Sequence, residues 1–347
     1  MPTGSYIAGR WFHPTSARVT RNINPADTSD VIAEFPSAGA ADVAAAVEAA
    51  TGAARGWRET PAPERGRVLA RAAAIARHRA GEIATTMTRE EGKILREARG
   101  EVTRGIAVLE YYAGAGFWIG GRTLPAEARD TFTYTIRRPL GVVGLITPWN
   151  FPWAIPCWKS APALVAGNTV VMKPAELTPA TAALLTEIYE EAGLPPGVFN
   201  LVVGPGAAVG SALVDHPGVR AISFTGSNAV GAALYAQAAR RGARVTCEMG
   251  GKNAVIVLPD ANLEKAATAI SSGAFGSTGQ RCTATSRVVA HPAVKDALVE
   301  RVGALAAAMK IGPGLDEATD LGPAVDEAQQ RTDLRYIGVA REEGARL

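Results

Sequence analysis

Several short stretches of the sequence place reactive side chains beside glycine, proline or the end of an apolar run. One is Gly-Gln-Arg-Cys-Thr at residues 279–283, where Cys282 follows a glycine-containing turn and has an arginine as its neighbour. A nearby cation favours the thiolate, which is the nucleophilic form of cysteine. Cys282 is therefore a candidate nucleophile, and the alternative is a small buried apolar residue. Cys157 and Cys247 lie in apolar surroundings and are expected to be packed.

A carboxylate and an amide form two further candidates. Glu248 ends an apolar run and precedes two glycines and Lys252. A carboxylate in apolar surroundings binds protons more readily and can act as a general base, whereas the alternative is a glutamate paired with Lys252 or with water. Asn150 lies between Pro148 and Pro152. A fixed amide can donate to an oxyanion, and ordinary turn chemistry explains the same pattern.

Two other stretches have the chemistry of a nucleotide site. Residues 223–231 lead from an apolar strand into a helix, and their glycines do not form the GxGxxG pattern. A helix N-terminus still favours a pyrophosphate, although Ser227 as an ordinary N-cap is the alternative. Lys173 and Glu176 follow another strand, where ligands bind in α/β sheets. They are candidates for ribose hydroxyls, or else a solvated surface pair.

The elements that would position these residues alternate along the chain. The strands expected after residue 140 are too apolar to have a face in water: 142–146, 169–172, 199–203, 221–224, 245–248 and 254–258. The helices expected between them are 179–192, 207–215, 229–240 and 263–275. Buried strands that alternate with helices predict a doubly wound α/β fold, with a parallel sheet covered on both faces. Residues 40–116 are expected to form two covering helical segments separated by Pro61 and Pro63, and residues 131–136 an exposed or edge strand.

Composition excludes several classes of protein. The 347 residues are 47% apolar and 20% charged, with 36 Lys and Arg against 33 Asp and Glu, which is typical of a globular protein of about two domains. No basic run with interleaved aromatic residues predicts a nucleic-acid partner, and no apolar run predicts a membrane span. The start of the chain has no signal pattern, so we expect a cytoplasmic location. Three cysteines predict neither a disulfide framework nor a zinc site, and we expect no bound metal.

Taken together and in this order, the motifs resemble those of the aldehyde dehydrogenase superfamily, whose members oxidise aldehydes to acids with NAD or NADP. They are Thr-Pro-Trp-Asn-Phe-Pro at 147–152, Lys-Pro-Ala-Glu at 173–176, Phe-Thr-Gly-Ser at 224–227, Glu-Met-Gly-Gly-Lys at 248–252 and Gly-Gln-Arg-Cys at 279–282. The resemblance covers nearly the whole chain. It implies a Rossmann-like cofactor domain and a second α/β catalytic domain.

The resemblance also implies a role for individual residues. Cys282 matches the nucleophile, Glu248 the general base, Asn150 the oxyanion donor together with the Cys282 N–H, and Lys159 a residue that relays protons from the base. The positions implied for the cofactor are Ile146, Thr147, Pro148, Trp149, Lys173, Glu176, Phe224, Gly226, Ser227, Gly231 and Met249. Those implied for the substrate are Phe151, Trp158 and Arg281.

This family resemblance leads to expectations about the cofactor and the substrate. Glu176 favours NAD over NADP, because a carboxylate on the ribose repels a 2′-phosphate. Glu248 favours hydrolysis of the acyl enzyme over transfer to coenzyme A. The run at 280–287 resembles that of enzymes for 2-oxoglutarate and succinate semialdehydes, and Arg281 or Arg287 is a candidate partner for the far carboxylate. The alternative function is a catalytically impaired, nucleotide-binding or structural relative.

The domain limits expected from the sequence are residues 1–120 and 141–250 for the NAD-binding domain, 121–140 for an oligomerisation strand and 251–347 for the catalytic domain. Family chains continue through a Glu-x-Phe-Gly-Pro stretch and a final strand that do not occur here. Residues 341–347 extend a helical pattern without an obvious cap. We therefore expect a C-terminally truncated chain with an incomplete catalytic domain, and a homo-oligomer at full length.

Overall fold

The computed structural model describes residues 2–14 and 18–346. Two compact units are present, and each is described by itself. The first contains residues 1–22, 33–84 and 99–249, and the second contains 23–32, 85–98 and 250–347, apart from the positions outside the described residues. The division by sequence had assigned 23–32 and 85–98 to the first domain. Their place in the second unit depends on contacts with residues far along the chain, which local patterns do not show.

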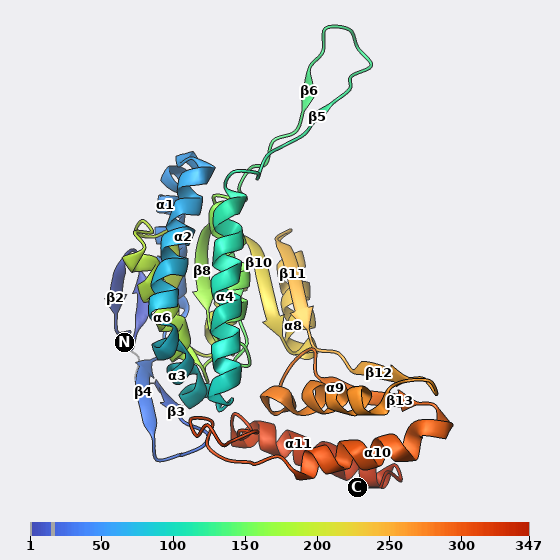
Figure 1. Ribbon diagram of the computed structural model, residues 1–347. Helices are drawn as coiled ribbons and strands as arrows, with labels where there is room; N and C mark the ends of the chain where they lie inside the picture. Colours follow the sequence, from blue (N-terminus) through green and yellow to red (C-terminus); the bar gives the residue numbers. More distant parts are fainter. Residues whose placement is uncertain (1, 15–17, 347) are drawn as a thin grey trace. The chain divides into compact units, whose positions relative to one another are not determined.

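The first unit is built on a seven-stranded sheet in the order β11-β10-β7-β8-β9-β1-β2 (Figure 1). The five strands from β11 to β9 run parallel, as the alternation of strands and helices predicted. β1 pairs antiparallel with β9 and with β2. The strands are β1 (Ser5–Ile7), β2 (Arg10–Phe12), β7 (Val142–Ile146), β8 (Thr169–Lys173), β9 (Phe199–Leu201), β10 (Val219–Gly226) and β11 (Arg244–Met249).

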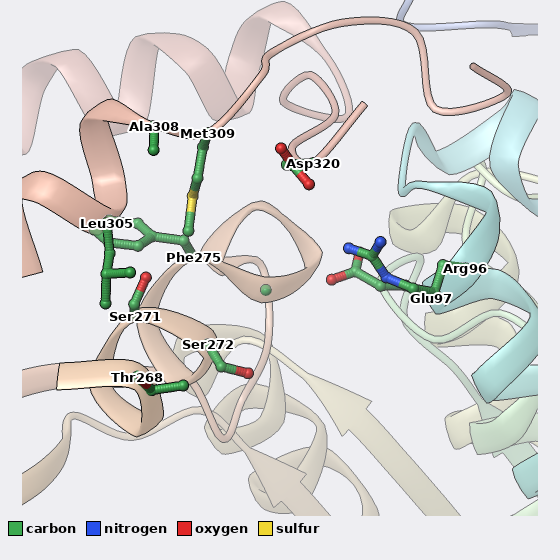
Figure 2. A pocket seen from close by; sticks show the side chains of 11 residues that line it. Arg96, Glu97, Thr268, Ser271, Ser272, Phe275, Leu305, Ala308, Met309 and Asp320 are labelled. Carbon is green, nitrogen blue, oxygen red and sulfur yellow. The ribbon is translucent and has the colours of Figure 1, made fainter. Parts of the chain in front are cut away.

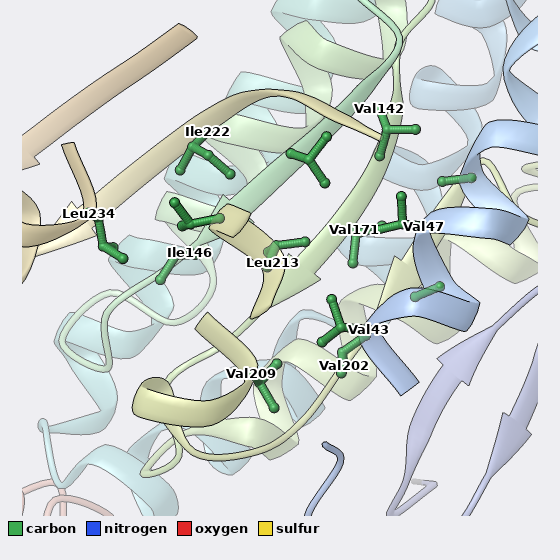
Figure 3. Packing of buried hydrophobic residues seen from close by; sticks show 14 of the residues in the cluster. Val43, Val47, Val142, Ile146, Val171, Val202, Val209, Leu213, Ile222 and Leu234 are labelled. Carbon is green, nitrogen blue, oxygen red and sulfur yellow. The ribbon is translucent and has the colours of Figure 1, made fainter. Parts of the chain in front are cut away.

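Helices cover both faces of this sheet, and every residue of β7 and β8 is therefore buried. α1 (Ala40–Glu59), α7 (Ser211–Asp215) and α8 (Asn228–Ala239) share one apolar cluster with the strands, which Figure 3 shows. On this side Val47, Val142, Leu213 and Ile222 are buried. The opposite face is covered by α5 (Ala154–Val165) and α6 (Pro179–Glu191), against which α2 (Ala62–His78) packs.

Four helices, not two, occupy residues 40–115. Besides α1 and α2 these are α3 (Ala80–Glu91) and α4 (Leu95–Ala115). Pro63 lies in the first turn of α2, where its missing N–H costs nothing. The sequence analysis missed two breaks, one at Arg79 between α2 and α3 and one at Gly92 between α3 and α4, where a φ of +92° cannot continue a helix. The predicted helix 207–215 is likewise divided into a π-helical turn, Gly206–Gly210, and α7.

The first unit carries a narrow two-stranded arm beyond the end of α4 (Figure 1). The arm pairs β5 (Thr123–Leu124) with β6 (Thr133–Tyr134), so the strand predicted at 131–136 is exposed as expected but shorter. Phe132 is 74% exposed and Tyr134 59%. A second short pair joins β3 (Val19–Ile23) to β4 (Val31–Pro36).

The second unit contains the predicted β-α-β run. β12 (Asn253–Val257) and β13 (Thr285–Ala290) are parallel and are linked through α9 (Leu263–Phe275), with α10 (Pro292–Ala307) packed on α9. Its apolar cluster contains Val257, Ile270 and Leu298. The expectation of an uncapped helix over 341–347 is wrong for the described part: α11 (Glu327–Glu342) ends before Gly344, which has a φ of +86°. Leu347 lies outside the described residues.

Candidate active site

Many of the residues predicted for the cofactor come together at the carboxyl ends of adjacent strands. Ile146 of β7 pairs with Lys173 of β8 on one side and with Phe224 of β10 on the other, and Gly226 pairs with Met249. In the sheet, β8 and β9 follow β7 on one side, whereas β10 and β11 follow it on the other side. This reversal of strand order is a topological switch point, at which open α/β sheets bind ligands.

The helix start beside this switch point is shaped by close packing. Ser227 accepts a 3.4 Å hydrogen bond from the Val230 N–H, so it is the N-cap of α8. A Cβ at Gly231 would lie 2.6 Å from the Met249 sulfur and 3.0 Å from the Phe224 ring, so glycine gives these two side chains room to pack against α8. Phe224 is 2% exposed and packs beneath this loop. The helix cap and the anion-binding helix start are compatible, because one side chain satisfies only part of the exposed N–H groups.

The Lys173 and Glu176 pair differs from a solvated surface pair. Lys173 is 4% exposed and its ammonium donates to the Pro174 carbonyl. Burial lowers the pKa of Lys173 to about 8, and the charge of Glu176 opposes this effect. Glu176 accepts a 3.4 Å hydrogen bond from Arg18, a cation that the sequence analysis did not consider. The pair therefore places a buried cation and a partly exposed carboxylate at the end of β8.

The turn that carries Asn150 is held by a buried carboxylate from α4. Glu101 accepts hydrogen bonds from the N–H groups of Trp153 and Ala154, each 3.0 Å long, and so caps the start of α5 from outside. A Cβ at Gly105 would overlap the Trp153 indole. Sequence reasoning missed Glu101, because nothing in its helical surroundings distinguishes it from an exposed glutamate. Asn150 itself is half-buried, just before these contacts.

Lys159 lies on α5 and contacts β10, the strand that pairs with Glu248-bearing β11. Its ammonium donates a 2.8 Å hydrogen bond to the Ser223 hydroxyl. Burial lowers the pKa of Lys159 to about 8, while the nearby charges of Glu248 and Cys247 act in the opposite direction. Glu248 itself is exposed at the end of β11.

An arginine that the sequence analysis did not single out lies next to a predicted substrate residue. The Arg104 guanidinium of α4 lies over the Trp158 ring, 5.3 Å from its centroid. Trp158 is 39% exposed and Arg104 is also exposed. A guanidinium stacked on an aromatic ring contacts the ring through its flat face, so the N–H donors at its edge stay available to a carboxylate. The only sequence signal was a basic residue within an otherwise ordinary helix.

In the second unit, Cys282 is exposed and its backbone is fixed by a neighbouring strand. Asn253 donates to the carbonyls of Cys282 and Ala284, at 2.7 and 3.0 Å. Arg281, predicted to contact the substrate, donates to the carbonyls of Ser272 and Gly273 at the end of α9.

The other two cysteines are packed, as expected. Cys157 is fully buried and Cys247 is partly buried. Burial raises the pKa of both thiols, which disfavours their thiolates. Of the three thiols, Cys282 is therefore the one that a solvent-borne electrophile reaches most easily.

A separate cavity of about 360 Å³ lies in the second unit (Figure 2). Phe275, Leu305 and Met309 form its apolar wall, and Arg96, Glu97 and Asp320 contribute charged groups. None of the residues predicted for catalysis, cofactor or substrate lines it.

The chain belongs to the aldehyde dehydrogenase family, whose model matches residues 11–347. It is 48% identical to alpha-ketoglutaric semialdehyde dehydrogenase of Bacillus subtilis over 99% of this chain and 70% of that protein. It is 44% identical to malonate-semialdehyde dehydrogenase 1 of Geobacillus thermodenitrificans over the same shares. The NAD+ complex of an aldehyde dehydrogenase from Bacillus cereus superposes with a TM-score of 0.96 at 34% identity, covering 99% of this chain and 70% of that one.

These matches establish the activity class, oxidation of an aldehyde with a nicotinamide cofactor, and the α/β fold predicted for it. Among the residues that the structure describes, no helix is long and apolar enough to cross a membrane.

Proposed function

We propose that the substrate is a semialdehyde, an aldehyde that carries a carboxylate at its other end, and that the product is the dicarboxylic acid. The observation that carries this proposal is the Arg104 guanidinium over Trp158, a position that the family resemblance assigns to the substrate path. Arg281 and Arg287, the cations first considered, already donate to backbone carbonyls. The names of the similar enzymes support the same substrate class, and their differences leave the length of the substrate open.

The residues at the switch point suit a nicotinamide dinucleotide. The start of α8 has the positive end of a helix dipole for the pyrophosphate, and the carboxylate of Glu176 suits ribose hydroxyls. We propose that Lys173 donates to the same ribose and that NAD is preferred, although the contact of Arg18 with Glu176 partly offsets repulsion of a 2′-phosphate. When bound, the nicotinamide accepts the hydride that the aldehyde carbon loses.

The protein's own residues would carry the remaining steps. The Cys282 thiolate attacks the aldehyde carbon, and the new oxyanion is held by the Asn150 amide and the Cys282 N–H. Loss of hydride leaves a thioester on Cys282. Glu248 then takes a proton from water, the resulting hydroxide attacks the thioester carbon, and the thiolate leaves as the acid forms. Lys159 accepts the proton from Glu248 and returns it to solvent.

The test combines the purified chain with NAD and measures reduced nicotinamide. The substrates are malonate, succinate and 2-oxoglutarate semialdehydes beside unsubstituted aldehydes of matched length. We expect Arg104→Ala to raise KM for semialdehydes by about 10- to 100-fold, the loss of one charge-assisted hydrogen bond, and to leave KM for the unsubstituted aldehydes unchanged. Arg99→Ala, a change of an exposed arginine on the same helix, is the control.

Two results would count against the proposal. Equal effects of Arg104→Ala on both substrate classes would refute recognition of the carboxylate. Binding of NAD without turnover of any aldehyde would favour the alternative of a nucleotide-binding relative.

We further propose that the protein is cytoplasmic and forms a homo-oligomer through the arm of β5 and β6. Support comes from Phe132, Tyr134 and Ile136, whose large apolar side chains are more than half exposed on a two-stranded arm. Light scattering of the wild type and of Phe132→Ser tests this assignment, with a lower molar mass expected for the variant.

A further inference from the structure

The face of the sheet beneath α5 changes from apolar to polar between β7 and β11. Ser223 of β10 pairs with Thr246 of β11, and Thr225 pairs with Glu248, so these four side chains lie on one face. The neighbour of Ser223 on β7 is Leu145, which is fully buried. A hydroxyl at position 223 is therefore the innermost polar group on this face, at the boundary with the apolar core.

The Lys159 amine meets this face at Ser223. The hydrogen bond to the hydroxyl is 2.8 Å long and joins residues 64 positions apart in the chain. Ser223 precedes Thr225, the partner of Glu248, by two residues, which corresponds to roughly 7 Å along a strand. The hydroxyl thus binds the amine two residues before the strand position that pairs with Glu248.

Glu248 and Cys247 on β11 favour the charged form of the Lys159 amine, and burial disfavours it. The Arg65 guanidinium of α2 also contacts α5, but it binds the Val165 carbonyl at the last residue of that helix and not the Lys159 amine. A hydrogen bond that the ammonium donates to Ser223 favours the ammonium, because the neutral amine is a weaker donor.

We propose that Ser223 is a positioning residue for Lys159: its hydroxyl holds the amine on the sheet face that carries Glu248 and sets the pH range over which the amine takes up the proton that Glu248 removes from water. The proton passes from the Glu248 carboxyl to the neutral amine, which becomes ammonium and later releases it to solvent. This inference rests on the roles proposed for Glu248 and Lys159.

The test measures the titration of Lys159 directly. The folded protein is labelled with trace acetic anhydride across a range of pH, and the acetylated Lys159 peptide is quantified by mass spectrometry, with exposed Lys265 as an internal reference. We expect Ser223→Ala to lower the titration midpoint by roughly one pH unit, which from a midpoint of about 8 means about a fivefold rise in neutral amine at pH 7. Ser223→Thr should retain the wild-type midpoint.

Two further variants complete the design. Thr246→Ala removes an exposed hydroxyl beside Ser223 and should leave the midpoint unchanged. Ser223→Cys keeps the side-chain volume with a weaker acceptor, and it replaces the alanine variant if that one does not fold. Steady turnover should shift along the pH axis in the same direction as the midpoint, while the pre-steady-state burst keeps its amplitude.

An unchanged Lys159 midpoint in the alanine or cysteine variant, or the same shift in Thr246→Ala, would overturn the inference. The labelling result does not depend on turnover. Failure of every aldehyde as a substrate would therefore refute the proposed function and leave the role of Ser223 to be decided by the titration.

Discussion

Replacement of Glu101 by alanine should destabilise the first unit far more than loss of an exposed glutamate does. Its carboxylate is 5% exposed and accepts from two backbone N–H groups at the start of α5. Alanine would leave both donors buried without an acceptor. Each costs about 1–3 kcal/mol, and loss of a negative charge at a helix N-terminus adds about 0.3–1 kcal/mol. We expect a loss of about 2–7 kcal/mol in the free energy of unfolding.

The comparison with glutamine isolates the charge. Glu101→Gln retains an oxygen acceptor and should cost about 1–2 kcal/mol, because a neutral acceptor makes weaker bonds. The control is Glu110→Ala on the same helix, where the exposed ion pair with Arg77 contributes less than about 1 kcal/mol. Urea unfolding followed by tryptophan fluorescence measures all three. A loss in Glu101→Ala no larger than in Glu110→Ala would refute the capping role.

Four other expectations concern packing, titration and the order of chemical steps. Gly105→Ala should cost about 1–3 kcal/mol by overpacking, whereas Gly114→Ala, with open space among the described residues, should stabilise by up to about 1 kcal/mol; urea unfolding distinguishes them. Because burial lowers the pKa of Lys173 to about 8, the free energy of unfolding of the wild type should rise as the pH increases from about 8 towards 10.5. Lys173→Met removes the buried cation and should be more stable than the wild type in urea at pH 7, and this difference should shrink over the same pH window. Glu248→Gln should leave a burst of about one reduced nicotinamide per chain but no steady turnover; absence of the burst would contradict its role as base. Iodoacetamide should alkylate Cys282 first, as read by peptide mass spectrometry.

Local patterns were sufficient for most of the secondary structure around the site. β7 and α9 have the predicted bounds, because an unbroken apolar run and a regular apolar face are properties of neighbouring residues. The break between α3 and α4 was missed, since Gly92 within a helical pattern does not by itself reveal a positive φ. The family followed from the order of the motifs, and comparison with known proteins confirms it.

The amino-acid sequence by itself predicted the class of chemistry, which the family match confirms, and it nominated the residues proposed to carry that chemistry, because residue types and the order of motifs can be identified without a fold. Only the tertiary structure decided which side chains hold them. Glu101 reaches the start of α5 across 52 positions, and Ser223 reaches Lys159 across 64. Such partners are chosen by strand order and helix packing, which depend on the burial of the whole apolar surface and leave no local trace.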